Sequence, residues 1–424
     1  MAIEVLQQVR VIDAVAGTDR TADVLLEDGM IQAIEAQITP PEGSQLRSGQ
    51  GLILGPGLVD LYSRSGEPGH EERETLDSFM AAAIAGGFTQ VNVLPTTTPA
   101  IDNPATISWI REQVQSRLLS SLSAMPTLPR LQFWGALTLE TAGQQMVELG
   151  ELAPHVVGFA DGKAITNLAM LRRILEYLQP LQKPLMLWAY DPSLAGHGVA
   201  REGVNALKFG LPGIAVMAES APLAAILELL QEIPVPVHFM RVSTARGVEL
   251  IQAAKAQGLP VTASTTWLHL LLDTNDLGTY DPNLRLSPPL GNPSDRLALI
   301  QAVKTGVIDA IAVDHQAYTY EEKTVAFGEA PMGAIGLELA FPTLWHYLVE
   351  TEHLTAVELW RALSCQPLAC LGKSTPELTL GGCHDWILFQ PDQTWTVTGQ
   401  TLKSRSFNTH YLNQTLQGRV SQVG

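Results

Sequence analysis

Apolar and polar residues follow two different periods along this chain, which divide it into two ends and a middle. Near both ends, short segments alternate residue by residue between Asp-Gly or Gly turns, a pattern typical of strands. These strand-like segments are residues 5–13, 22–29, 30–36, 385–391 and 394–399. Two β-rich ends around a long middle predict one small β-sandwich, with parts at residues 1–54 and 373–424.

The middle of the chain, residues 55–372, alternates short apolar runs with helical patterns. The apolar runs are typical of buried strands and lie at residues 88–95, 131–137, 156–160, 185–190, 237–243, 259–265 and 308–314. The helical patterns lie between them, for example at residues 74–86, 170–179, 222–231 and 296–306. Repeated strand–helix units predict an α/β fold with a parallel sheet, and the length of this segment favours a (β/α)8 TIM-type barrel.

Composition narrows the classes of function. A net charge of -17 repels phosphate backbones, so we expect no nucleic-acid partner. No apolar run approaches the ~20 residues that a membrane helix needs, and the first residues lack the pattern of a signal peptide. Three cysteines without CxxC spacing argue against a disulfide framework. We therefore expect a cytoplasmic protein without a membrane span.

Chemistry in such a barrel belongs at the C-terminal ends of the strands. Asp314 and His315 follow the last apolar run, but inherited structure is sufficient to explain a lone Asp-His pair. Cys383-His384-Asp385 contains the side chains of a nucleophilic triad. Adjacent strand residues point to opposite faces, so we do not expect these three to act together.

Several segments resemble the dihydroorotase family of the amidohydrolase superfamily. PGLVDLYSRSGEPG at residues 56–69 is similar to the family's PGLVDxHxHLREPG, and residues 81–103 are similar to its AAARGGFTTVxxMPNTNPxxDN. Further similar blocks lie at residues 191–213, 242–251, 308–315, 329–342 and 403–420. The resemblance covers essentially the whole chain and implies the barrel fold, with zinc-dependent hydrolysis of a cyclic amide in active members.

The same resemblance implies four zinc-binding histidines, and none of them is present. Their positions are occupied by side chains that are poor zinc ligands: Tyr62, Arg64, Trp188 and Arg241. Two acidic positions remain. Asp314 matches a metal ligand and general base of the family, and Asp161 lies in a segment one residue shorter than its family counterpart. We therefore expect no bound metal, although zinc is the cofactor of the family.

The positions that contact substrate in the family have changed as well. The arginine that would hold the substrate carboxylate is replaced by Gly66. Two asparagines and a histidine of the family's substrate site are replaced by Thr96, Ser287 and Tyr318. Losing the metal ligands and the carboxylate clamp together predicts a site without the family's chemistry.

Three histidines near the altered positions fit structural roles. His70 is expected to be a loop residue, and His269 a packing residue with satisfied hydrogen bonds. His238 lies three residues before Arg241, so we expect it to face the opposite side of its strand.

Three functions are compatible with this pattern. The first is a catalytically inactive scaffold or partner subunit, since inactive dihydroorotase-like chains of the family assemble with aspartate carbamoyltransferase, the enzyme of the preceding step in pyrimidine biosynthesis. Such a chain is also expected to form a homo-oligomer. The second is an active cyclic amidohydrolase with an altered metal site built on Asp314. The third is a small-molecule binding module, because a barrel mouth without metal is still a pocket.

The replacement residues themselves suggest what stands in the old metal site. Two of the four lost ligands are arginines, and the remaining aspartates would be buried negative charges without a cation. An arginine can satisfy a buried carboxylate with two parallel hydrogen bonds. We therefore predict an ion pair between Arg64 or Arg241 and Asp314 or Asp161, with atoms within about 4 Å.

Overall fold

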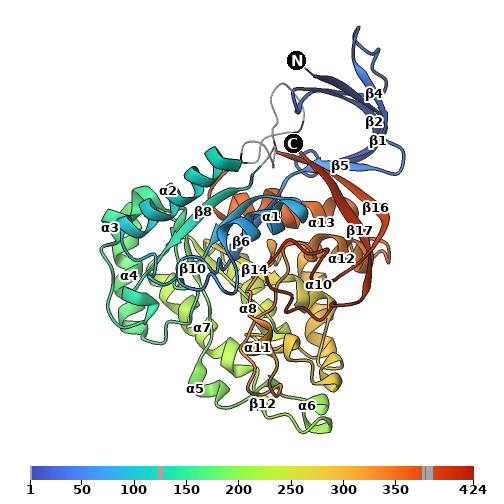
Figure 1. The fold of residues 1–424 in the computed structure, drawn as a ribbon. Helices are drawn as coiled ribbons and strands as arrows, with labels where there is room; N and C mark the ends of the chain where they lie inside the picture. Colours follow the sequence, from blue (N-terminus) through green and yellow to red (C-terminus); the bar gives the residue numbers. More distant parts are fainter. Residues whose placement is uncertain (1, 122–127, 375–377, 379–384) are drawn as a thin grey trace.

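The computed structural model describes residues 2–121, 128–374, 378 and 385–424 (Figure 1). Eight parallel strands form one sheet in the order β15-β14-β13-β10-β9-β8-β7-β6. They are β6 (Leu58–Ser63), β7 (Phe88–Val93), β8 (Arg130–Gly135), β9 (Gly158–Phe159), β10 (Leu185–Leu187), β13 (Val237–Phe239), β14 (Val261–Thr266) and β15 (Ala310–Ala312). This confirms the predicted α/β barrel.

The first and last strands of this sheet meet just beyond their C-terminal ends. The backbone amide of Asp314 donates to the carbonyl of Tyr62 at 3.1 Å, and that of Arg64 donates to His315 at 2.9 Å. The buried carboxylate of Asp60 also accepts a hydrogen bond from the amide of Val313 at 2.8 Å. The barrel is therefore closed at the end that carries the candidate residues.

Helices surround the barrel, and they alternate with its strands as the sequence predicts (Figure 1). The longer ones are α1 (Leu76–Ala85), α2 (Pro104–Ser121), α4 (Leu168–Leu178), α7 (Met217–Glu232), α8 (Ala245–Ala256), α10 (Pro293–Thr305) and α13 (Ala356–Leu363). Short helices are α3 (Leu149–Leu152), α5 (Pro192–Ala195), α6 (Val204–Lys208), α9 (Trp267–Leu271), α11 (Tyr320–Lys323), α12 (Ala340–Leu344) and α14 (Cys365–Cys370). No helix within the described part of the chain is both long and apolar enough to cross a membrane.

The local sequence explains where several helices begin. Thr75 and Ser78 form a reciprocal capping box at α1, and Thr355 and Glu358 form one at α13. Each box satisfies backbone N–H groups that the first helical turn leaves without a partner. Helix α4 presents Met170, Leu171 and other apolar residues at helical spacing to the core.

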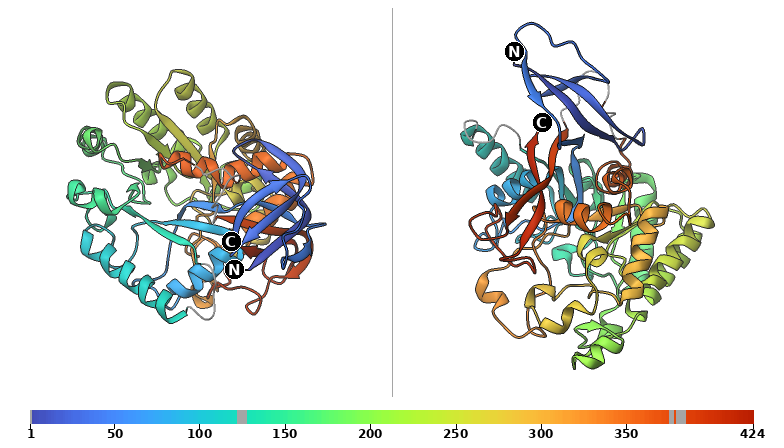
Figure 2. Two further views of the ribbon diagram at one scale, coloured as in Figure 1. Left: turned by 90° about the horizontal axis from the view of Figure 1, so that it is seen from above. Right: turned by 90° about the vertical axis from the view of Figure 1, so that its right-hand side faces the viewer.

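The two strand-rich ends of the chain combine, as predicted, into one β-unit, which consists of a single mixed sheet rather than the two packed sheets of a sandwich. Its mixed sheet has the order β17-β16-β5-β1-β2-β3, and β4 pairs with β1. The strands are β1 (Ile3–Asp13), β2 (Thr18–Glu27), β3 (Met30–Glu35), β4 (Gln45–Ser48), β5 (Ile53–Pro56), β16 (Trp386–Thr396) and β17 (Thr415–Val423). Strand β16 pairs antiparallel with β5, which joins the two ends directly. Figure 2 shows this sheet on one side of the barrel, with both termini near each other.

Much of the barrel interior below the mouth is apolar. Leu61, Leu94, Trp134, Met186 and Met240 form one buried cluster together with small residues of β15. The indole of Trp134 donates to the carbonyl of Leu61 at 2.9 Å, so its polar atom is satisfied. A polar network around His238 lies within this packing, and the remaining polar candidates meet at the mouth.

Candidate functional site

The residues at the altered ligand positions meet at the mouth of the barrel. Tyr62 is on β6 and Arg64 follows it directly, while the other positions follow β10, β13 and β15. These are Trp188, Arg241 and Asp314, which line one cavity together with Arg64. Sequence reasoning therefore placed these side chains at the correct end of the barrel.

Arg241 and Asp314 form a bidentate ion pair at this mouth. The Nε and Nη2 atoms of Arg241 each donate to a different oxygen of Asp314, both at 2.6 Å. The side chain of Arg241 is 1% exposed and that of Asp314 is 15% exposed. The Nη1 atom of Arg241 donates to the carbonyl of Gly162 at 3.0 Å. The predicted arginine–aspartate pair is confirmed in this form.

A left-handed backbone at Arg241 (φ 59°) turns its side chain into the mouth. This conformation is uncommon for residues other than glycine, so neighbouring contacts must hold it. The hydroxyl of Tyr62 accepts a hydrogen bond from the backbone amide of Arg241 at 3.1 Å. The guanidinium also lies 5.0 Å from the ring centroid of Trp188, within the range of a cation–π contact.

The expected orientation of His238 is wrong. Its Nε2 atom lies 2.8 Å from Oγ of Ser264, which lies 3.2 Å from the hydroxyl of Tyr62. Tyr62 in turn contacts the backbone of Arg241, so His238 and Arg241 belong to one hydrogen-bond network. Simple strand alternation would separate them, but the positive φ at Arg241 interrupts the alternation.

Charges at the mouth stabilise the ionised form of Asp314. Burial by itself would raise the pKa of Asp314, but the guanidinium of Arg241, followed by that of Arg64, holds this pKa below its usual range. Burial, followed by the negative charge of Asp314, raises the pKa of the Tyr62 phenol. At neutral pH the mouth therefore holds a carboxylate, two guanidinium groups and a neutral phenol.

This set of side chains does not fit zinc. A zinc ion needs about four N, S or O donors, whereas the guanidinium groups of Arg64 and Arg241 are cations and the indole of Trp188 offers no lone pair for a metal. Asp314 could serve as a donor, but both of its oxygens accept hydrogen bonds from Arg241. Among the described residues, no cluster of three or more His, Cys, Asp or Glu side chains is arranged to hold a metal.

Asp161 does not take part in the ion pair. Its carboxylate accepts hydrogen bonds from the amides of Leu137 and Thr138 at 2.8 and 3.1 Å, and from the Thr138 hydroxyl at 2.6 Å. Burial raises the pKa of Asp161, an effect that these hydrogen bonds oppose. The side chain fixes the loop after β8, so its role in this structure is structural.

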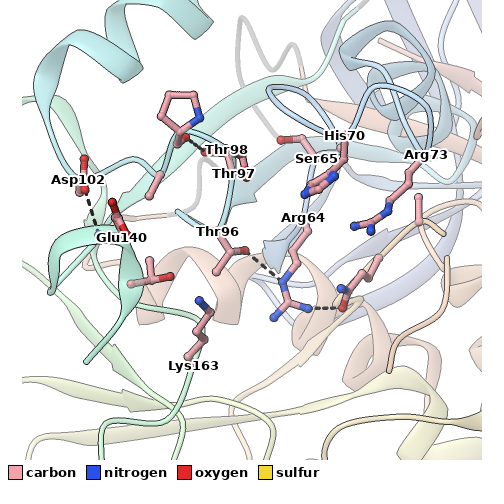
Figure 3. Close-up of a pocket in the computed structure, with 16 residues that line it drawn as sticks. Arg64, Ser65, His70, Arg73, Thr96, Thr97, Thr98, Asp102, Glu140 and Lys163 are labelled. Atoms are coloured by element: carbon pink, nitrogen blue, oxygen red, sulfur yellow. Dashed lines mark hydrogen bonds between the residues drawn. The ribbon is translucent and has the colours of Figure 1, made fainter. Parts of the chain in front are cut away.

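Arg64 is held by neutral groups (Figure 3). Its Nε atom donates to the hydroxyl of Thr96 at 3.1 Å, and its Nη1 atom donates to the side-chain oxygen of Gln316. Gln316 also donates to the hydroxyl of Tyr318. Thr96 and Tyr318, two of the altered substrate positions, thus lie beside Arg64.

The other two altered substrate positions differ in their surroundings. Ser287 lines the same inner cavity as Arg241. Gly66 lies in a tight loop, where an added Cβ atom would be 2.3 Å from the carbonyl oxygen of Glu74 and 2.6 Å from that of His70. The loop in this conformation has no room for the arginine that the family carries at Gly66.

Two connected cavities open at the barrel mouth. The inner one has a volume of about 240 Å³ and is lined by Trp188, Arg241, His269 and Asp314, among others. The outer one has a volume of about 950 Å³ and is lined by Arg73, Thr96, Asp102 and Glu140, among others. Arg64 lines both cavities and therefore lies where they meet.

His315 points away from both cavities. Its Nε2 atom lies 3.2 Å from the carboxylate of Glu74, and its Nδ1 atom accepts a hydrogen bond from the amide of Gly336 at 3.2 Å. Both the His315 and Glu74 side chains are essentially buried. His315 is thus a structural residue, as expected for an inherited Asp-His pair.

Two other histidines considered from the sequence lie near the mouth: His269 lines the inner cavity and His70 lines the outer one. His269 lies 2.7 Å from the hydroxyl of Thr266 and 3.2 Å from a backbone carbonyl, as expected for a satisfied packing residue. Burial lowers the pKa of His269 to about 4, so this imidazole is neutral at pH 7. His70 is half-buried in a loop, as expected. Cys383 and His384 lie outside the described residues.

Sequence reasoning missed Lys163 and Gln316. Lys163 follows Asp161 and Gly162 after β9, and Gln316 follows the Asp314–His315 pair. Both side chains line both cavities. The available signal was their place: each is a polar residue within a few positions of a strand's C-terminal end.

Comparisons with known proteins agree on ancestry. The family model described as "Dihydro-orotase-like" matches residues 51–232. A protein of Synechocystis sp. named "Probable dihydroorotase-like protein" is 47% identical and covers 97% of both chains. A "Dihydroorotase" of Pelobacter propionicus is 35% identical over 97% of this chain and 96% of its own.

Solved structures share the fold. The L-hydantoinase of Arthrobacter aurescens superposes with a TM-score of 0.84 and 20% identity, covering 100% of this chain and 95% of its own. The extent and identity of the sequence matches, over nearly the full length, show that this chain belongs to the dihydroorotase-like family of the amidohydrolase superfamily.

Proposed function

We propose that this chain is a catalytically inactive dihydroorotase-like protein of pyrimidine biosynthesis that acts as a partner subunit of aspartate carbamoyltransferase. The observation that supports catalytic inactivity is the buried, bidentate pair between Arg241 and Asp314. It occupies two of the positions at which active family members bind zinc. Assembly as a homo-oligomer is part of the same proposal.

The pair blocks the one acidic group that could act as a base. Asp314 matches the family's general base, but each of its oxygens accepts a 2.6 Å hydrogen bond from Arg241. Accepting a proton would break this contact and leave the guanidinium buried without a counter-charge, which is costly. The alternative of an altered cyclic amidohydrolase needs Asp314 to be available, and the geometry therefore disfavours it.

The substrate side of the site supports the same proposal. Gly66 has no side chain for a carboxylate clamp, and its loop excludes a Cβ atom. Arg64 lies on the opposite wall of the loop region but is already bonded to Thr96 and Gln316. The sequence thus has neither the four histidine ligands nor the arginine clamp of the family at the matching positions.

Two observations support a role through assembly. The barrel and the terminal sheet are complete although the ligand set is altered, so the fold persists without the chemistry. In addition, the short helix α6 exposes Val204 and Leu207, whose exposed fractions are 81% and 85%. These residues are three positions apart and so share one helix face, a feature of surfaces that contact another protein.

Co-purification tests the partnership. The full chain would be tagged in its source cell, purified gently and measured by native mass spectrometry. The proposal expects a complex that contains aspartate carbamoyltransferase, weakened by Leu207→Asp but not by Leu297→Asp, an exposed residue on α10 (54% exposed) that serves as the control. A monomer or homo-oligomer without a transcarbamoylase in any fraction would overturn the proposal.

A further inference from the structure

Cations outnumber carboxylates in the inner cavity, although the whole chain has a net charge of -17. The residues lining this cavity include the cations Arg64, Lys163 and Arg241, but among the carboxylates only Asp314. Arg241 directs two of its nitrogens to Asp314, which neutralises one charge. Arg64 and Lys163 form no ion pair within the described residues, although the charge of Asp314 acts on Arg64 and that of Asp161 acts on Lys163.

Arg64 is a cation surrounded by neutral partners. Its three acceptors are the hydroxyl of Thr96, the amide oxygen of Gln316 and, at 3.5 Å, the carbonyl of Gly162. Burial, followed by the nearby charge of Arg241, lowers the pKa of Arg64 below its usual value. An anion next to this guanidinium would relieve both the desolvation and the like-charge repulsion.

Lys163 is the second cation and is exposed at the rim of the cavity. No described residue accepts a hydrogen bond from its ammonium group or forms an ion pair with it. Figure 3 shows its side chain rising from the loop after β9 toward the space that Arg64 also enters. Both side chains line the inner and the outer cavity.

Trp188 forms part of the wall of the same cavity. Its ring stacks on Tyr190 with centroids 4.6 Å apart, which fixes the plane of the indole. Its Nε1 atom is buried and has no hydrogen-bond partner among the described residues. The indole therefore shapes the cavity, and its N–H is closed off from it in this conformation.

We propose that the inner cavity binds a small dianion, held by the guanidinium of Arg64 and the ammonium of Lys163. The volume of about 240 Å³ corresponds to about eight water molecules at ~30 Å³ each. A four-carbon dicarboxylate or a phosphate has a suitable size. Both share the required chemistry, which is two negative charges on oxygen atoms.

The carboxylates of the outer cavity favour the inner position. Asp102 and Glu140 line the far part of the outer cavity and would repel a dianion there. These carboxylates repel an entering anion, whereas Arg64 and Lys163 attract it, and Arg73 of the outer cavity is paired with Glu322. This inference concerns ligand binding alone and stands whether or not the chain assembles with a transcarbamoylase.

Isothermal titration calorimetry of the full chain tests the inference. The probes are succinate, inorganic phosphate and, as an uncharged control, succinamide. The chains are the wild type, Arg64→Gln, Lys163→Gln and the control Lys208→Gln, which changes an exposed lysine on α6. We expect saturable binding of at least one dianion with a Kd below about 1 mM, and no binding of succinamide.

The variants decide where the dianion binds. Removing either cavity cation is expected to weaken binding about tenfold or more, while Lys208→Gln leaves it unchanged. Tighter binding of succinate would indicate a dicarboxylate ligand, and tighter binding of phosphate would indicate a phosphate ligand. No saturable binding of either anion, or equal binding by all four chains, would overturn the inference.

Discussion

Asp314 and His315 are neighbours in the chain, yet they belong to two buried polar clusters with different hydrogen-bond partners. Asp314 faces the mouth and pairs with Arg241, one of the residues that departs from the family's ligand set. His315 faces the barrel wall and contacts Glu74, which also accepts a hydrogen bond from the hydroxyl of Ser404 at 2.5 Å. The cluster around His315 joins elements of the fold, whereas the cluster around Asp314 lies at the mouth of the barrel.

The two clusters also differ in how their charges are satisfied. At the mouth, one cation meets one anion, so the charges of Arg241 and Asp314 could be removed together. At the wall, several donors from different elements converge on the single carboxylate of Glu74. The cluster around Asp314 is a single ion pair. The cluster around Glu74 connects three parts of the fold: the start of helix α1, the end of strand β15 and the segment before β17.

Breaking the pair at the mouth should have the largest effect on stability. Arg241→Met leaves the buried carboxylate of Asp314 without its cation, so we expect the free energy of unfolding to fall by about 3–5 kcal/mol. Arg241→Met combined with Asp314→Leu should cost much less than the sum of the single changes. Urea denaturation of the three variants measures this coupling.

A half-exposed pair provides the control for that measurement. Arg73 contacts Glu322, and the side chains are 24% and 30% exposed. Arg73→Met should lower the free energy of unfolding by no more than about 1 kcal/mol. Equal losses for Arg241→Met and Arg73→Met, or additive losses at Arg241 and Asp314, would show that the mouth does not hold a coupled buried pair.

The junction at the wall should respond differently to paired substitution. Glu74→Gln offers one acceptor oxygen to several donors, and we expect a loss of roughly 2–3 kcal/mol. Adding His315→Gln should not restore stability, because the hydroxyl of Ser404 and the amide of Arg405 still lack their acceptor. Denaturant midpoints of the single and double variants distinguish the two outcomes. If the double variant regained the stability lost in Glu74→Gln, the cluster around Glu74 would behave as a simple pair, like that of Arg241 and Asp314.

The network below the mouth should make stability depend on pH. Burial lowers the pKa of His238 to about 3, whereas an unfolded histidine titrates near 6.5. The unfolded chain therefore binds a proton that the folded chain does not, and stability is lost as the pH falls below about 6.5. His238 alone should contribute a loss of about 2 kcal/mol between pH 7 and pH 5.

The variant His238→Gln isolates this contribution, because glutamine does not titrate. The remaining acid sensitivity should come from other groups, including His269, whose pKa is lowered to about 4. We expect the pH dependence of the urea midpoint to become shallower in His238→Gln. An unchanged slope between pH 7 and pH 5 would show that His238 titrates in the folded protein as it does in the unfolded chain.

Much of the fold could be predicted from the sequence. The change from strand-like to helical periods locates the terminal sheet and the barrel, because each period reflects which side of an element is buried. The positions of Tyr62, Arg64, Trp188 and Arg241 followed from the resemblance, and their meeting at one mouth followed from the barrel geometry.

The finer arrangement of the site could not be predicted because it depends on backbone conformation and on tertiary partners. The left-handed φ of Arg241 overrides strand alternation and brings it into the network of His238. Asp161 was an equal candidate for the ion pair, but amides of the loop after β8 take up its carboxylate. Lys163 belongs to no motif, and its place shortly after β9 is the only signal that the sequence offers for it.

Metal content, measured together with activity, tests the central claim most directly. The claim is that Arg241 and Asp314 form an ion pair where active relatives bind zinc. The full chain, purified from a host that lacks its own dihydroorotase and supplied with zinc, would be studied by elemental analysis and assayed for dihydroorotate hydrolysis. The account predicts no stoichiometric zinc and no turnover above background. Two results together would contradict it: about one or two zinc ions per chain with measurable hydrolysis in the wild type, and loss of both in Asp314→Ala.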